Sequence, residues 1–212
     1  MKIVVDNVME RYRKEKIPIE KFELGTMSSR DNYVSSRVFP WIDKCLDIAI
    51  QNGVKDLVLT LRSYQLPIFT IFAAKSLREL VVWGCTSMPV SLSSGVVNCN
   101  SLRKLSLSDV KLDENMLQTL LNGCPMIVSF ILKCCSGLKK IELLNLQKIR
   151  SVSIKTHKMQ RLNIQAPTLE HLFYSGFSEE LDVVECQNLK SLELSDVYIS
   201  AKTMSMLHVL IS

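Results

Sequence analysis

One hexapeptide pattern recurs along the chain: an apolar residue, two variable residues, an apolar residue, a variable residue and a final apolar residue. Eight copies begin at positions 19, 54, 77, 102, 127, 149, 169 and 189. After a first interval of 35 residues, the spacings are 23, 25, 25, 22, 20 and 20 residues. A unit of this length cannot bury its apolar face alone, so such units stack as the coils of a solenoid. This repeat constrains the fold more than any other feature of the sequence.

The pattern and its period are typical of leucine-rich repeats. We therefore predict an α/β fold, a leucine-rich-repeat solenoid with a curved parallel sheet on its concave side and mixed short helices and extended segments on its convex side. Weaker copies of the hexapeptide begin at Leu138 and Met159. Ten or eleven residues cannot complete a coil, so we expect these two copies to be extended segments on the convex side.

The segments between the repeat strands predict four helices. They cover residues 2–14, which end before Pro18, then 38–51, 113–122 and 201–210. Asp113 and Ser200 are residue types that cap helix N-termini. The expected domain organisation is an N-terminal helix and linker at 1–17, followed by one leucine-rich-repeat domain at 18–212. We find no polar repeat that would cap the C-terminal end of this solenoid.

The charge distribution argues against nucleic acid as a partner. The formal net charge is +5, and residues 133–161 contain eight Lys or Arg and one acid. Residues 170–196 contain seven acids and one Lys, and this stretch would repel phosphate groups. A nucleic-acid surface also needs interleaved aromatic residues, and the basic stretch has only Phe130 at its edge.

Nothing in the sequence indicates an enzyme. The common nucleotide, serine-hydrolase and zinc-protease motifs are absent, and His157, His171 and His208 have no nucleophile or carboxylate at a suggestive spacing. The seven cysteines form no CxxC pair, so we expect reduced structural thiols rather than a disulfide framework or a zinc site. We predict no cofactor and no metal.

The sequence predicts a protein of the cytoplasm or nucleus. The apolar run near the N-terminus covers only residues 3–5, too short for a signal peptide. Residues 80–102 carry no charge, but Pro89 and Gly95 argue against a membrane span. No N-x-Ser/Thr sequon occurs in the chain.

Side chains between the apolar positions of each hexapeptide face away from the core, because strand side chains alternate. We expect a target protein to bind this concave row. Trp83 is the first candidate because large aromatics carry much binding energy, and the alternative is that it packs against a neighbouring coil. Lysines on three successive coils could meet an acidic or phosphorylated segment, or could be simply solvated. The full set of candidates is Trp83, Val81, Glu79, Lys104, Ile131, Lys133, Lys155, His171 and Phe173.

Five stretches together resemble the plant F-box/LRR proteins, including those that often carry a C-terminal FBD domain. The stretches are VDNVMERYRKEKIPIEKFEL at 5–24, WIDKCLDIAIQNGVKDLVL at 41–59, KSLRELVVWGC at 75–85, NCNSLRKLSLSDVKLDENMLQTLLNGCPMI at 98–127 and QAPTLEHLFYSG at 165–176. Their order and spacing make the resemblance specific, and it covers essentially the whole chain.

This resemblance implies the substrate-recognition part of a cullin–RING ubiquitin ligase of the SCF type. In that family an F-box docks a Skp-type adaptor, and the repeats present a target protein for ubiquitination. We expect the F-box to be missing here, so that a Skp-type adaptor and a cullin are partners only if an F-box is supplied. The alternatives are a stand-alone LRR interaction or scaffold protein, and a truncated fragment with no ligase role.

Overall fold

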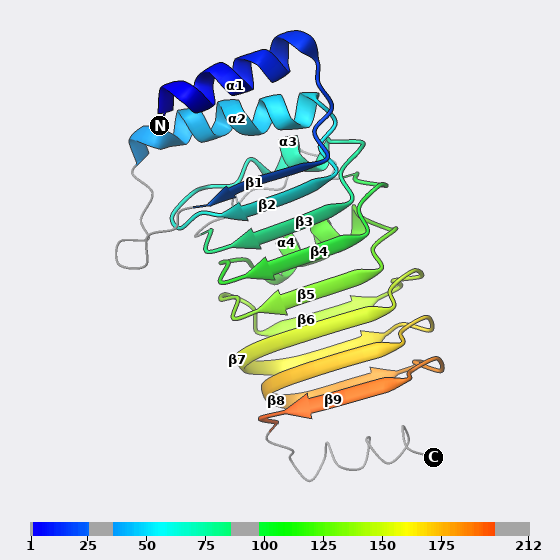
Figure 1. Ribbon diagram of the computed structural model, residues 1–212. Helices are drawn as coiled ribbons and strands as arrows, with labels where there is room; N and C mark the ends of the chain where they lie inside the picture. Colours follow the sequence, from blue (N-terminus) through cyan, green and yellow to red (C-terminus); the bar gives the residue numbers. More distant parts are fainter. Residues whose placement is uncertain (1, 26–35, 86–97, 198–212) are drawn as a thin grey trace.

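The computed structural model describes residues 2–25, 36–85 and 98–197. Nine strands, four α-helices and one short 3₁₀-helix lie in these ranges (Figure 1). The helices are α1 (Lys2–Glu15), η1 (Ser36–Val38), α2 (Phe39–Gln51), α3 (Ile68–Phe72) and α4 (Glu114–Asn122). The strands are β1 (Lys21–Gly25), β2 (Asp56–Thr60), β3 (Glu79–Trp83), β4 (Lys104–Ser108), β5 (Ser129–Lys133), β6 (Lys140–Leu144), β7 (Ser151–Gln165), β8 (His171–Val184) and β9 (Ser191–Ser195).

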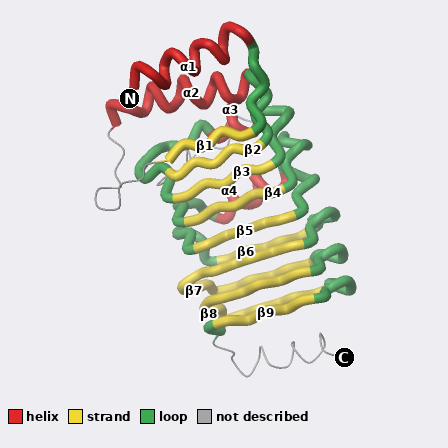
Figure 2. Tube along the Cα trace, viewed as in Figure 1, coloured by secondary structure: helices red, strands yellow, loops and turns green. Residues whose placement is uncertain are grey.

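The strands form one parallel sheet, with the order β1-β2-β3-β4-β5-β7-β8-β9 and with β6 paired to β7 away from this path. Each of the eight predicted repeat strands is present and begins two residues after the start of its hexapeptide. Helices α3 and α4 lie behind the sheet, and α1 and α2 lie at its β1 end (Figures 1 and 2). The predicted α/β leucine-rich-repeat solenoid is confirmed.

Two rows of apolar side chains form the core behind the sheet. The pairing register places equivalent residues of every coil side by side, so that Leu57, Leu80 and Leu105 are neighbours across three strands. All the members of these rows on β2, β3, β4, β5, β7 and β8 are at most 2% exposed. Full burial of such a side chain stabilises the fold by roughly 1.5–3 kcal/mol. The last apolar position of the hexapeptide therefore contributes as much to the buried core as the first two positions.

A ladder of shared carbonyl groups links each coil to the next. The carbonyl of Lys55, just before β2, accepts hydrogen bonds from the N–H groups of Arg78 (2.7 Å) and Glu79 (3.0 Å). The residue before β3 repeats the arrangement, since the Arg78 carbonyl accepts from Arg103 (2.7 Å) and Lys104 (3.0 Å). Equivalent pairs continue as far as β9. The coils are thus held in one register by backbone groups alone.

The two N-terminal helices pack against each other at the β1 end of the sheet. The indole N–H of Trp41 donates to Asp6 Oδ1 at 2.6 Å, and Met9 packs in a buried cluster with Cys45 and Ile48. The predicted helices at 2–14 and 38–51 are confirmed. Val8, the residue before Met9 in α1, is 47% exposed.

Among the described residues, the helices behind the sheet lie in the first half of the solenoid. Helix α4 begins after Asp113, whose side chain accepts a hydrogen bond from the Met116 N–H at 2.8 Å, so the predicted N-cap is confirmed. Helix α3 was not predicted, because its five residues are too few to establish a helical period. The predicted helix at 201–210 and the C-terminal end of the solenoid lie outside the described residues.

From β6 onwards, strands replace the helices behind the sheet. Strand β6 and the second half of β7 pair in parallel, with Lys140 opposite Arg161, and they coincide with the two weaker hexapeptide copies. The prediction of extended convex segments is therefore confirmed. Helix α4 borders β6, where Glu114 Oε1 accepts from the N–H groups of Lys139 (2.7 Å) and Lys140 (3.2 Å). Partial burial opposes ionisation of Glu114, but these N–H groups outweigh it and lower the pKa of its carboxyl.

The long strands β7 and β8 bend from one side of the solenoid to the other (Figure 1). At the bend, the pairing register shifts between Lys155 and Lys158. Gly176 of β8 lies here with φ +141°, and a Cβ at this position would come within 2.2 Å of the Thr156 carbonyl oxygen. Only glycine lets the two chains approach so closely.

We predict that Gly176→Ala lowers the free energy of unfolding by about 3 kcal/mol, through steric overlap and backbone strain. Gly53→Ala is the control, because Gly53 also has a positive φ (+72°) but its Cβ would meet no atom closer than 3.9 Å. It should cost about 1 kcal/mol. Urea denaturation of both variants measures the difference, and equal losses would contradict a close approach at the bend.

We predict that Glu114→Ala destabilises the chain by about 1–2 kcal/mol at pH 7, because the backbone N–H groups at the start of β6 lose a charged acceptor. A carboxyl whose pKa is lowered by folding stabilises the folded state at pH values above its usual pKa of 4.5. This stabilisation is lost as the pH falls through the folded-state pKa. The gap in melting temperature between wild type and variant should therefore narrow below pH 4.5. A gap that widens on acidification would contradict this role.

Candidate functional site

The side chains that alternate with the core residues form the open face, the side of the sheet turned away from α3 and α4. The pairing register arranges them in three rows across the strands. The first row is Lys21, Asp56, Glu79, Lys104, Ser129, Ser151, His171 and Ser191. The middle row is Glu23, Val58, Val81, Ser106, Ile131, Ser153, Phe173 and Glu193. The third row is Gly25, Thr60, Trp83, Ser108, Lys133, Lys155, Ser175 and Ser195.

The first row is polar and its central charges are paired. Lys104 Nζ lies 3.1 Å from Glu79 Oε2 across β3 and β4. Exposed pairs of this kind add little stability, but they satisfy both charges. The structure therefore separates Lys104 from the other two candidate lysines, which belong to the third row. His171 is an exposed member of the first row.

The middle row carries the apolar residues of the open face. Val58 and Val81 are direct neighbours, and Ile131 and Phe173 are separated by Ser153 alone. All four apolar side chains are half-buried. Strand spacing puts Ile131 and Phe173 roughly 10 Å apart. A small serine therefore lies between two larger apolar side chains.

Trp83 occupies the third row and is half-buried. The Arg62 Cζ atom lies 4.8 Å from the centre of its ring, a cation–π contact with the preceding coil. The Arg62 side chain also passes over Gly84, where an added Cβ would lie 3.0 Å from Arg62 Cγ. Arg62 was missed by the sequence analysis because it lies outside the hexapeptides. Trp83 thus combines one face packed on a neighbouring coil with a partly exposed remainder.

Lys133 and Lys155 lie side by side in the third row, on β5 and β7. Both are exposed, and neither forms an ion pair with any residue in the described ranges. Asp109, in the turn after β4, donates its backbone N–H to the Lys133 carbonyl at 2.9 Å without an ion pair to either ammonium group. Two adjacent positive charges therefore stand uncompensated on the open face.

The turns at the third-row edge repeat one backbone conformation. The residues that follow β3, β4, β5 and β9 all have a positive φ, namely Gly84 (77°), Asp109 (54°), Cys134 (51°) and Asp196 (54°). Asp and Asn tolerate this left-handed region better than most residues. The recurring Ser-Asp dipeptides at the ends of β4 and β9 thus have a structural explanation.

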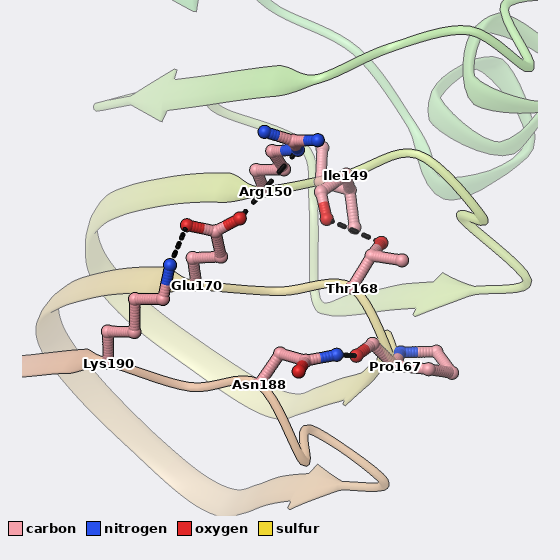
Figure 3. A network of polar contacts seen from close by, with 7 residues as sticks. All are labelled: Ile149, Arg150, Pro167, Thr168, Glu170, Asn188 and Lys190. Atoms are coloured by element: carbon pink, nitrogen blue, oxygen red, sulfur yellow. Dashed lines mark hydrogen bonds and ion pairs between the residues drawn. The ribbon is translucent and has the colours of Figure 1, made fainter.

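The charges at the opposite edge of the sheet are linked from coil to coil (Figure 3). Glu170 lies 2.8 Å from Lys190 and 3.7 Å from Arg150, and the ion pair with Lys190 lowers the pKa of its carboxyl. Farther along the long strands, Arg161 Nη2 lies 3.1 Å from Asp182 Oδ2. The basic stretch at 133–161 and the acidic stretch at 170–196 therefore neutralise each other in part.

The seven cysteines are free thiols. Burial raises the pKa of Cys85 to about 12, whereas a hydrogen bond with the Cys124 thiol lowers the pKa of the buried Cys99. No group of three or more His, Cys, Asp or Glu in the described ranges is placed to hold a metal ion. No helix among the described residues is both long and apolar enough to span a membrane.

Repeated coils, one closed core and one open face define a leucine-rich-repeat protein. A family model described as the LRR repeats of the FBD-associated F-box protein At5g56370 matches residues 42–204. The match covers well over half of the chain, so the chain belongs to this family. The resemblance seen in the sequence is confirmed.

Curated relatives from Arabidopsis thaliana support the same family. F-box/LRR-repeat protein At3g03360 is 24% identical over 90% of this chain and 40% of its own length. F-box/FBD/LRR-repeat protein At2g26030 is 22% identical, over 91% of this chain and 45% of the relative. F-box protein At5g03100 is 25% identical, over 73% of this chain and 50% of the relative. The chain thus spans about half or less of each of these relatives. No solved structure gives a significant match.

We predict that Trp83→Ala leaves unfolding cooperative and costs at most about 1.5 kcal/mol, because it removes a half-buried side chain and one cation–π contact. Leu80→Ala on the same strand is the comparison. Leu80 is fully buried, and its truncation should cost about 3 kcal/mol. Thermal melts followed by circular dichroism test the pair, and a larger loss for Trp83→Ala would place the tryptophan in the core.

Proposed function

We propose that this chain is a protein-binding module whose open face holds a target protein, as the substrate-recognition part of an SCF-type cullin–RING ubiquitin ligase. One observation carries the binding role: half-buried Val58, Val81, Ile131 and Phe173 form a row on the open face, beside Trp83. Monomer surfaces seldom gather apolar side chains without a partner, and partly exposed aromatics are frequent anchors at interfaces.

The shape of the open face suits an elongated partner. Its rows cross eight neighbouring strands, a distance of roughly 34 Å at the usual strand spacing. Serines at 106, 108, 129, 151, 153 and 175 keep the centre of this surface low. The sheet holds these residues by backbone pairing, so a partner meets a surface that is already ordered, which lowers the entropic cost of binding.

The ligase role rests on the family. The relatives are named as F-box proteins, and this chain matches their repeat portion. In our proposal the repeats hold the target, an F-box recruits a Skp-type adaptor and a cullin, and other subunits carry out the transfer of ubiquitin. This chain then needs neither a catalytic group nor a cofactor of its own, and it works in the cytoplasm or nucleus.

The test is affinity purification of the chain from plant cells under proteasome inhibition, followed by mass spectrometry. Trp83→Ala should reduce recovery of the target at least tenfold, because the anchor of the open face is lost. Gln160→Ala, an exposed position on the convex half of β7, is the matched control and should leave recovery unchanged.

Each outcome of this purification is informative. Recovery of a Skp-type adaptor and a cullin with the target supports the ligase role. Recovery of target proteins alone, still dependent on Trp83, supports the binding role and identifies a binding module without ligase subunits, because a Skp-type adaptor and a cullin are expected only where an F-box is supplied. Recovery that is the same for wild type and Trp83→Ala contradicts binding at the open face.

A further inference from the structure

Two neighbouring positive charges on the open face have no ion-pair partner among the described residues. Lys133 and Lys155 are direct neighbours, roughly 5 Å apart at the backbone, and both ammonium groups point away from the core. Their neighbours within the row are Ser108 and Ser175, which carry no charge. Repulsion between two adjacent cations favours any ligand that brings negative charge to this point.

Several basic residues close to this pair have ion-pair partners. Arg150 and Lys190 share Glu170, and Arg161 pairs with Asp182. On the described part of the open face, Lys21 pairs with Glu23 and Lys104 with Glu79, so Lys133 and Lys155 are the lysines without an ion-pair partner. They lie beside the apolar residues that we propose as the target-binding surface.

The apolar and basic parts lie within reach of one short peptide. Trp83 is two strands from Lys133 and three strands from Lys155 in the same row, or roughly 10 and 14 Å. An extended peptide advances about 3.3 Å per residue, and its side chains face the sheet at every second position. Residues two and four positions from a side chain on Trp83 would lie about 7 and 13 Å along the row, within reach of the long side chains of the lysine pair.

We propose that the open face binds an extended acidic segment of the target protein, with an apolar side chain against Trp83 and Val81 and carboxylates at Lys133 and Lys155. This inference rests on the proposed function and names the chemistry of the target. Two separate ammonium groups on neighbouring strands match two carboxylates of an extended chain. The acids at the ends of the middle row, Glu23 and Glu193, disfavour a continuous polyanion such as nucleic acid.

The test uses two matched peptide arrays and the full chain. In the first array, every peptide has Leu, Phe or Trp at one position and Glu two and four residues later, with the other positions varied. In the second array, both Glu are replaced by Gln. We expect the strongest acidic peptides to bind at least tenfold more tightly than their Gln counterparts, and raised salt should reduce this difference.

Charge-reversed variants locate the effect. Lys133→Glu combined with Lys155→Glu should abolish the preference for the acidic array. Lys75→Glu combined with Lys148→Glu changes the net charge equally, at exposed positions in the loops before β3 and β7, and should retain the preference. Equal binding to both arrays, an unchanged preference in the first variant, or no binding to either array would overturn the proposal.

Further outcomes separate this inference from the function on which it rests. One outcome is a cellular target that requires Trp83 and yet binds the Lys133→Glu, Lys155→Glu double variant as well as it binds the wild type. This outcome agrees with the proposed function and overturns the proposal that the target binds through an acidic segment. Binding of a single-stranded oligonucleotide with the same lysine dependence would also overturn it. A cellular target that is lost on charge reversal, and that contains the apolar and acidic pattern, supports it.

Discussion

The pairing of each coil with its neighbour in one constant register is the constraint on which the rest of the structure depends. A single coil of this chain has one or two strands and a set of apolar side chains that it cannot bury by itself, so it cannot fold alone. Pairing places every core row in line, and the shared carbonyls before each strand, such as that of Lys55, fix the position of the next coil. A closed core on one side and three ordered rows on the other follow together from this register.

The register also decides which candidate residues can act together. Lys104, Lys133 and Lys155 occupy three successive coils in the sequence, yet Lys104 belongs to the first row and pairs with Glu79, while the other two are neighbours in the third row. The first row therefore holds a paired lysine, and the third row holds two lysines without an ion-pair partner. The proposed chemistry of the target comes from this difference.

Much of the fold follows from local sequence signals, whereas much of the site does not. The hexapeptide period predicted the strands, the Asp113 cap predicted a helix start, and the weaker repeat copies predicted the convex segments. Each of these signals lies within a few residues of the chain. The cation–π contact of Arg62 with Trp83 joins residues of different coils, as do the hydrogen bonds of Glu114 to the start of β6. No period or motif marks such partners, since only the stacking of the coils brings them together.

The most direct test of the open face as the binding surface is site-specific photo-crosslinking in plant cells. A photoreactive amino acid is placed at Ser153, in the middle row of β7, or at Gln160, on the convex half of the same strand. A target bound at the open face should give a discrete crosslinked product from position 153 and none from position 160. Crosslinking to the same target from position 160 alone would show that the partner binds the other side of the solenoid, and it would contradict binding at the open face.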